Sequence, residues 1–93
     1  MEEIDLDTLV TRADGFKTAS VQDDLMMLNI EQGAYYSMDS IGAEIWEMLK
    51  VPSSARDLVE RLQQRYSVTP EQCQQDVLGF LREMRTNGMI LVK

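Results

Sequence analysis

The stretch from Gly33 to Leu49, GAYYSMDSIGAEIWEML, changes its hydrophobic period halfway along. Residues 34–38 alternate between two faces, with Tyr36 and Met38 on the same one, which predicts a β-strand. After Asp39, a residue type that caps helices, apolar residues recur at helical spacing: Ile41, Ile45, Met48 and Leu49. A strand that runs almost directly into a helix predicts a domain in which helices pack on an antiparallel sheet.

The remaining chain predicts further strands before this stretch and further helices after it. Residues 16–22 and 25–30 have strand-like patterns, and the second is apolar on both faces, which predicts a central strand covered on each side. Ser53 or Ser54 can cap a second helix, and Thr69 followed by Pro70 begins a third. Asn87-Gly88 ends that helix, residues 89–93 can add a last strand, and residues 1–15 form a flexible or short-strand arm.

Together these elements predict one α+β domain over residues 1–93, winged helix-turn-helix-like, with a three-stranded antiparallel sheet followed by three helices. A winged helix-turn-helix shape is common among DNA-binding proteins. The third predicted helix argues against that role, because its acidic residues outnumber its basic ones. The acidic residues are Glu71, Asp76 and Glu83, and the basic ones are Arg82 and Arg85. A transcription factor therefore stays an alternative of lower rank.

Charge and composition exclude several other functions. The net charge is −7, with 9 basic and 16 acidic residues, so nucleic acid and anionic membrane surfaces are not expected partners. There is no His, which removes the most common general base and metal ligand, and Cys73 has no base to activate it. We expect no enzymatic activity, no metal and no cofactor. The acidic N-terminus is unlike a signal peptide and indicates a cytoplasmic protein.

Three segments together resemble a known family: LMMLNIEQGAYYSMDSIGAEIWEML, ARDLVERL and DVLGFLREMRTNGMI. Their ordered features are similar to the PqqD-like leader-peptide-binding domains, also called RiPP recognition elements. The matching positions are Leu28, Gly33, Tyr36, Met38, Gly42, Ile45, Trp46, Asp76, Val77, Phe80, Leu81 and Gly88. The chain departs from the family pattern at Met38-Asp39, where Leu-Asn is frequent, and Asp can cap a helix as Asn does. It most resembles the stand-alone recognition proteins of lasso-peptide biosynthesis.

The resemblance implies non-catalytic binding of the leader segment of a ribosomally synthesised precursor peptide. The leader would add as a strand and be presented to a leader peptidase or another maturation enzyme. A peptide chaperone of pyrroloquinoline-quinone type, serving a radical enzyme, is the alternative within the family. The implied peptide-binding residues are Ala34, Tyr35, Tyr36, Ser37 and Met38 on the edge strand, and Asp76, Phe80, Arg82 and Glu83 on the third helix. An open strand edge can also accept a second copy, so a homodimer stays open.

Overall fold

The computed structural model describes residues 4–22 and 24–93. It contains three helices and two small antiparallel sheets in these residues. The helices are α1 (Ser40–Met48), α2 (Ala55–Arg65) and α3 (Pro70–Thr86). The strands are β1 (Leu9–Arg12), β2 (Phe16–Val21), β3 (Asp24–Asn29), β4 (Ala34–Met38), β5 (Ser53–Ser54) and β6 (Ile90–Val92). The α+β class and the three-helix order predicted from the sequence are confirmed.

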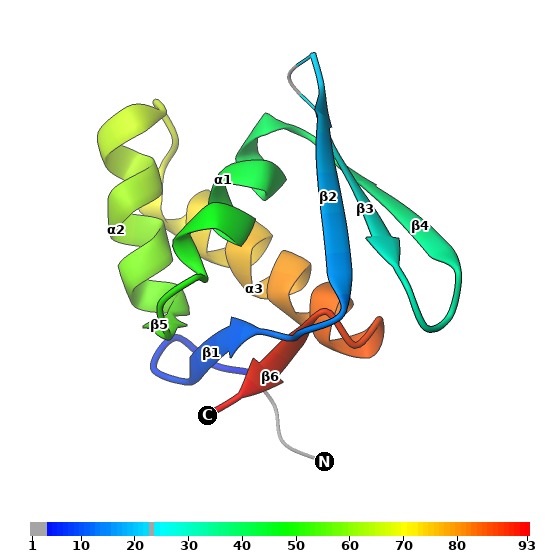
Figure 1. The fold of residues 1–93 in the computed structure, drawn as a ribbon. Coiled ribbons are helices and arrows are strands. Elements are labelled where there is room, and N and C mark those ends of the chain that lie inside the picture. Colours follow the sequence, from blue (N-terminus) through cyan, green and yellow to red (C-terminus); the bar gives the residue numbers. More distant parts are fainter. Residues whose placement is uncertain (1–3, 23) are drawn as a thin grey trace.

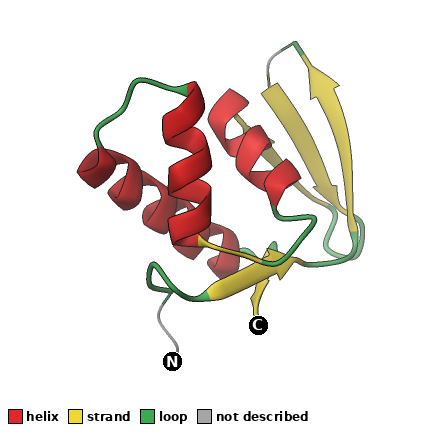
Figure 2. Ribbon diagram, turned by 90° about the vertical axis from the view of Figure 1, so that its left-hand side faces the viewer, coloured by secondary structure: helices red, strands yellow, loops and turns green. Residues whose placement is uncertain are grey.

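The larger sheet has the order β2-β3-β4, so β3 is central and both neighbours are edge strands. Its register pairs Met27 with Thr18 on one side and with Tyr36 on the other. The prediction that β3 is covered on both faces is wrong. Figure 2 shows the three helices on one side of this sheet and no helix on the other. Met26 and Leu28, on the uncovered face, are only half-buried, whereas Met27 on the helix side is buried.

The smaller sheet has the order β5-β1-β6 and joins distant parts of the chain (Figure 1). β1 pairs antiparallel with β6 through Val10 and Val92, and with β5 through Val10 and Ser53. Residues 9–12 are therefore the central strand of this sheet. Of the two alternatives for residues 1–15, a flexible arm or a short strand, the described part contains the short strand. β5 was not predicted, because two Ser residues after a Pro carry no strand pattern of their own.

Helix boundaries follow the capping signals of the sequence. The Asp39 carboxylate accepts a hydrogen bond from Gly42 N at 2.8 Å, and Thr69 Oγ1 accepts one from Gln72 N at 3.3 Å. Ser54 caps α2 in the same way through Asp57 N. Gly88 takes a left-handed φ of 72° after α3, as the Asn-Gly pair predicted. These local rules fix where each helix starts and ends, and hence the corner between β4 and α1.

One hydrophobic core lies between the helices and both sheets. Buried members come from almost every element, including Val10 of β1, Met27 of β3, Trp46 of α1, Leu58 of α2 and Leu81 of α3. Tyr36 and Phe80 pack against its margin and are only half-buried. The fold thus leaves aromatic side chains of β4 and α3 partly accessible near the edge of the larger sheet.

Candidate functional site

Within residues 4–22 and 24–93, no strand pairs with the outer edge of β4. Ile30 N donates to Gly15 O, next to the pairing of β2 with β3. Backbone groups alternate in direction along a strand, so the even-numbered residues of β3 point their N–H and C=O groups to β2. The backbone groups of Met27 therefore point to β4, where the partner is Tyr36. By the same alternation, the N–H and C=O groups of Tyr35 and Ser37 point away from the sheet. Two residues of β4 can accordingly bond an added strand without disturbing the ladder.

A hollow of about 350 Å³ lies beside the end of this edge. Its walls come from β4, α1, α2, α3 and the connection between the last two helices. The lining residues are Ser37, Met38, Asp39, Ile41, Gly42, Ile45, Leu62, Tyr66, Val68, Cys73, Asp76, Val77 and Phe80. The surface of the hollow is mostly apolar, which suits an apolar side chain carried by a strand bound at β4.

Gly42 lets α3 approach α1 closely at this hollow. A Cβ atom at this position would lie 3.0 Å from Phe80 Cζ and 3.2 Å from Met38 Cβ. Both distances are shorter than ordinary carbon–carbon contacts of about 3.5–4.0 Å. The absence of a side chain at Gly42 therefore allows the Phe80 ring to lie against the first turn of α1, between the helix and β4.

The charged groups around the hollow are carboxylates. Asp39 is held by its capping bond, and the Asp76 carboxylate accepts a hydrogen bond from Gln72 Nε2 at 2.9 Å. No lysine or arginine lines the hollow among the described residues. Burial raises the pKa of the Cys73 thiol, and the nearby Asp76 carboxylate raises it further. The start of a helix lowers the pKa of a nearby thiol, but burial and Asp76 outweigh that effect at Cys73, and the thiol stays protonated at neutral pH.

The structure brings some of the predicted peptide-binding residues together and separates others. Ser37, Met38, Asp76 and Phe80 line the hollow. Ala34 and Tyr36 lie on the helix side of β4, and the Tyr36 ring lies 6.4 Å from that of Phe16. Glu83 lies on α3 beyond the hollow and is exposed.

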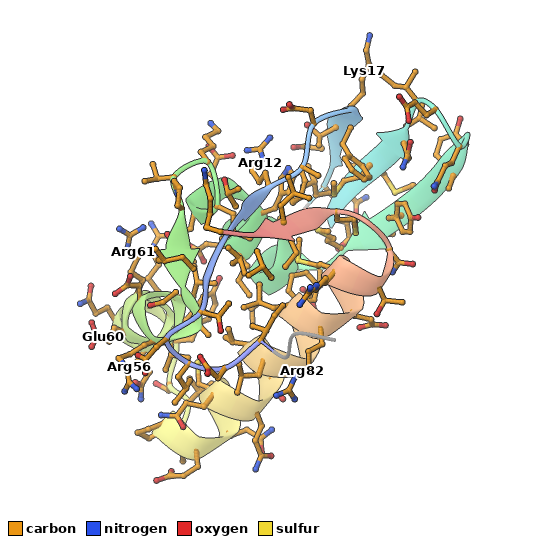
Figure 3. All side chains as sticks on the ribbon, turned by 90° about the horizontal axis from the view of Figure 1, so that it is seen from below. Arg12, Lys17, Arg56, Glu60, Arg61 and Arg82 are labelled. Carbon is orange, nitrogen blue, oxygen red and sulfur yellow. The ribbon has the colours of Figure 1, made fainter. Side chains whose placement is uncertain are left out.

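Tyr35 and Arg82 lie outside this cluster. The Tyr35 side chain is on the uncovered face of the sheet and is 72% exposed. Arg82 Nη2 donates to Ile4 O at 3.2 Å, so this guanidinium holds the N-terminal segment (Figure 3). The spacing of residues 76 and 80 along one helix face was a usable signal, whereas the direction of Arg82 was not visible in the sequence.

Several lining residues were not anticipated from the sequence. Ile41 and Val68 contribute exposed apolar surface, at 39% and 37% exposure. Tyr66, at the end of α2, closes another wall, and its hydroxyl donates to Glu44 Oε2 at 3.0 Å. Their places depend on how α2 crosses α1 and α3, and that crossing has no local signature. Cys73 and Val77, in contrast, share the helical period of Phe80 on the third helix.

Neither a metal site nor a membrane-spanning helix is present in the described residues. No group of three or more acidic or thiol side chains is placed to hold a metal ion. No helix in residues 4–22 and 24–93 combines the length and apolarity needed to cross a bilayer. The hollow beside β4 is thus the candidate site that best combines an apolar interior with free backbone groups.

Two solved structures are similar to this chain. The structure of TbiB1 in complex with the TbiA(beta) leader peptide superposes with a TM-score of 0.77 at 24% identity, covering 86% of this chain and 93% of that one. A lasso peptide synthetase B1 complexed with the leader peptide also gives 0.77, at 21% identity, covering 88% and 96%. No curated protein matches the chain.

These structures share the fold described above, and the shared fold includes nearly the whole length of each. The family model described as coenzyme PQQ synthesis protein D (PqqD) matches residues 24–90, from the beginning of β3 to the beginning of β6. That range includes the β4 edge, the hollow and all of α3. The chain therefore belongs to the PqqD family.

Proposed function

We propose that this protein binds the leader segment of a ribosomally synthesised precursor peptide by strand addition to β4, without catalysing a reaction. The observation that carries the proposal is the open β4 edge directly beside an apolar hollow. The two similar structures, each solved with a leader peptide, support the same assignment. Within the family, we propose a role of the lasso-peptide type, as in the lasso peptide synthetase B1 that is similar to this chain.

The geometry suggests how the leader would lie. Its backbone would exchange hydrogen bonds with Tyr35 and Ser37, which supply affinity for any extended sequence. Because side chains alternate along a strand, every second leader residue would point to the helix side. One of these would enter the hollow and contact Phe80 and Met38, and this contact would supply selectivity.

A binding role without catalysis also agrees with the chemistry of the site. The sequence holds no His, and the Cys73 thiol is buried with a raised pKa. A thiol kept protonated is a poor nucleophile. The bound leader would then be delivered to a leader peptidase or another maturation enzyme, which supplies the reaction.

Calorimetric titration with synthetic leaders tests the proposal. A leader encoded beside this gene should bind with a Kd of about 10 nM to 10 μM, since an unfolded peptide must be ordered on binding. The same leader with a scrambled sequence is the control. A leader of lasso type and one of pyrroloquinoline-quinone type, compared side by side, decide between the two alternatives within the family. A Kd above about 100 μM for every leader would contradict the proposal.

A further inference from the structure

Among the described residues, only carboxylates place charge on the walls of the hollow beside β4. They belong to Asp39 and Asp76. Repulsion between like charges is stronger beside apolar walls than in bulk water. Burial and then the Asp76 carboxylate raise the pKa of the Cys73 thiol, which lines the same hollow, so the charge of Asp76 acts on its interior. A positively charged group bound there would therefore lower the electrostatic free energy of the site.

The Asp76 carboxylate has room for a further partner. The residue is exposed, and within the described part of the chain its carboxylate accepts a hydrogen bond from the neutral Gln72 amide at 2.9 Å and forms no salt bridge. A carboxylate offers about four acceptor positions. Asp39 is more constrained, because its carboxylate accepts the capping bond from Gly42 N at 2.8 Å. Asp76 is thus the acidic group of the hollow that is best placed to bind a cation.

The basic residues of α3 lie away from Asp76. Glu83 follows Asp76 by about two helical turns, so this exposed carboxylate lies on the same side of the helix. Arg85 follows Asp76 by about two and a half turns and lies on the opposite side. Arg82 Nη2 donates to Ile4 O at 3.2 Å and so holds the N-terminal segment. The side of α3 that carries Asp76 is therefore acidic.

A strand added to β4 can contact Phe80 and Asp76 together. These two residues are one turn apart, or about 6 Å along α3. Side chains two residues apart on a strand point to the same face and are about 6.5–7 Å apart. A leader that places an apolar side chain against Phe80 can therefore place the side chain two residues away beside Asp76.

We infer that the site selects leaders that carry Lys or Arg two residues from the apolar anchor, and that Asp76 recognises this positive charge. The inference rests on the proposed function, because it requires a leader strand at β4. Arg can donate two hydrogen bonds to one carboxylate, and Lys can pair with it as a point charge, so either residue fits. A leader with Glu at this position would be repelled by Asp76.

Three synthetic peptides test the inference on the full chain. Each is an acetylated and amidated nonapeptide of Ser and Thr with Leu at its centre. The residues two positions before and after Leu are both Lys, both Gln or both Glu. Amide proton–nitrogen correlation NMR should show the tightest binding for the Lys peptide, with a Kd of about 10 μM to 1 mM, and the weakest for the Glu peptide. The preference for Lys over Gln should shrink as salt rises from about 0.05 M to 0.5 M.

Two variants separate Asp76 from the general attraction of a chain of net charge −7. Asp76→Asn keeps the size of the side chain and an acceptor for Gln72. It should raise the Kd of the Lys peptide by about 2- to 5-fold, as for loss of an exposed ion pair, and leave that of the Gln peptide unchanged. Glu60→Gln is the matched control, since it removes one negative charge from an exposed position on α2 outside the hollow, near Arg56 in Figure 3. It should leave the preference for Lys unchanged.

Two results would overturn the inference. One is a Lys peptide that binds no better than the Gln peptide or does not bind, and the other is a preference for Lys that Asp76→Asn and Glu60→Gln reduce equally. A titration with the leader encoded beside this gene, in the same spectra, reads the β4 edge through the amides of Tyr35 and Ser37. Leader shifts at Tyr35 and Ser37 without a preference for Lys reject this inference alone, whereas the absence of leader shifts rejects the proposed function.

Discussion

Replacing Ser37 with Pro separates strand addition from ordinary surface binding. The N–H of Ser37 points away from the sheet, so Pro at this position removes a donor that the fold does not use. The leader would lose one backbone hydrogen bond, which contributes about 0.5–1.5 kcal/mol. That loss corresponds to a rise in the leader Kd of about 2- to 13-fold. The free energy of unfolding should change little.

Tyr36→Pro supplies the opposite case at the next residue. The Tyr36 N–H points into the ladder opposite Met27, so its removal leaves a carbonyl of β3 unsatisfied. The expected cost is about 1–3 kcal/mol of folding stability. Ser37→Ala is the matched control for the first variant, because it removes the hydroxyl and keeps the backbone donor.

Fluorescence polarisation with a labelled leader measures the affinities, and urea unfolding followed by Trp46 fluorescence measures stability. We expect Ser37→Pro to fold normally and bind the leader more weakly, and Ser37→Ala to fold normally and bind the leader as the parent does. Equal Kd values for Ser37→Pro and Ser37→Ala, both folded, would refute the claim that the leader pairs with this edge. A fully stable Tyr36→Pro would refute the assignment of which groups point inward.

Three further predictions concern the hollow. Phe80→Ala should raise the leader Kd by at least about 5-fold, as for a contact at the centre of an interface, and a leader lacking its apolar anchor should not distinguish the variant from the parent. Gly42→Ala should change stability by less than about 1 kcal/mol, because better helix propensity is offset by the 3.0 Å contact with Phe80, while the leader Kd rises; a gain of the full 1 kcal/mol in urea with unchanged Kd would contradict this. The pKa of Cys73 is raised in the folded protein, so its contribution to stability is complete below the unfolded pKa of about 8.5 and is lost as pH rises through the folded value. Urea unfolding between about pH 8 and pH 10 should show that the free energy of unfolding falls more steeply with pH for the parent than for Cys73→Ala. Identical slopes for the two proteins would contradict this prediction.

The sequence predicted those features that depend on neighbouring residues. The N-caps Asp39 and Thr69, and the left-handed Gly88, followed from residue types that satisfy helix ends within a few positions. The β2-β3-β4 order followed from the short connections between these three strands. These signals were sufficient for the fold class and for the corner between β4 and α1.

What the sequence could not predict depends on contacts between distant segments. β5 exists only because Ser53 meets Val10, and a two-residue strand has no pattern of its own. The uncovered face of β3 was unpredictable for the same reason, since a continuous apolar run does not say whether a partner is present. In the candidate site, Asp76 and Phe80 were found by helix spacing, whereas Tyr66 and Val68 line the hollow through the crossing of α2 and α3.

The smaller sheet also decides where the protein can be tethered. Lys93 N donates to Leu9 O at 2.8 Å, so the end of the chain lies beside the entry to β1. Figure 1 shows this region below the helices. A label, an immobilising linker or a fused domain attached after Lys93 would leave both long strand edges accessible. Shortening the chain into β1 would instead remove the middle strand of that sheet.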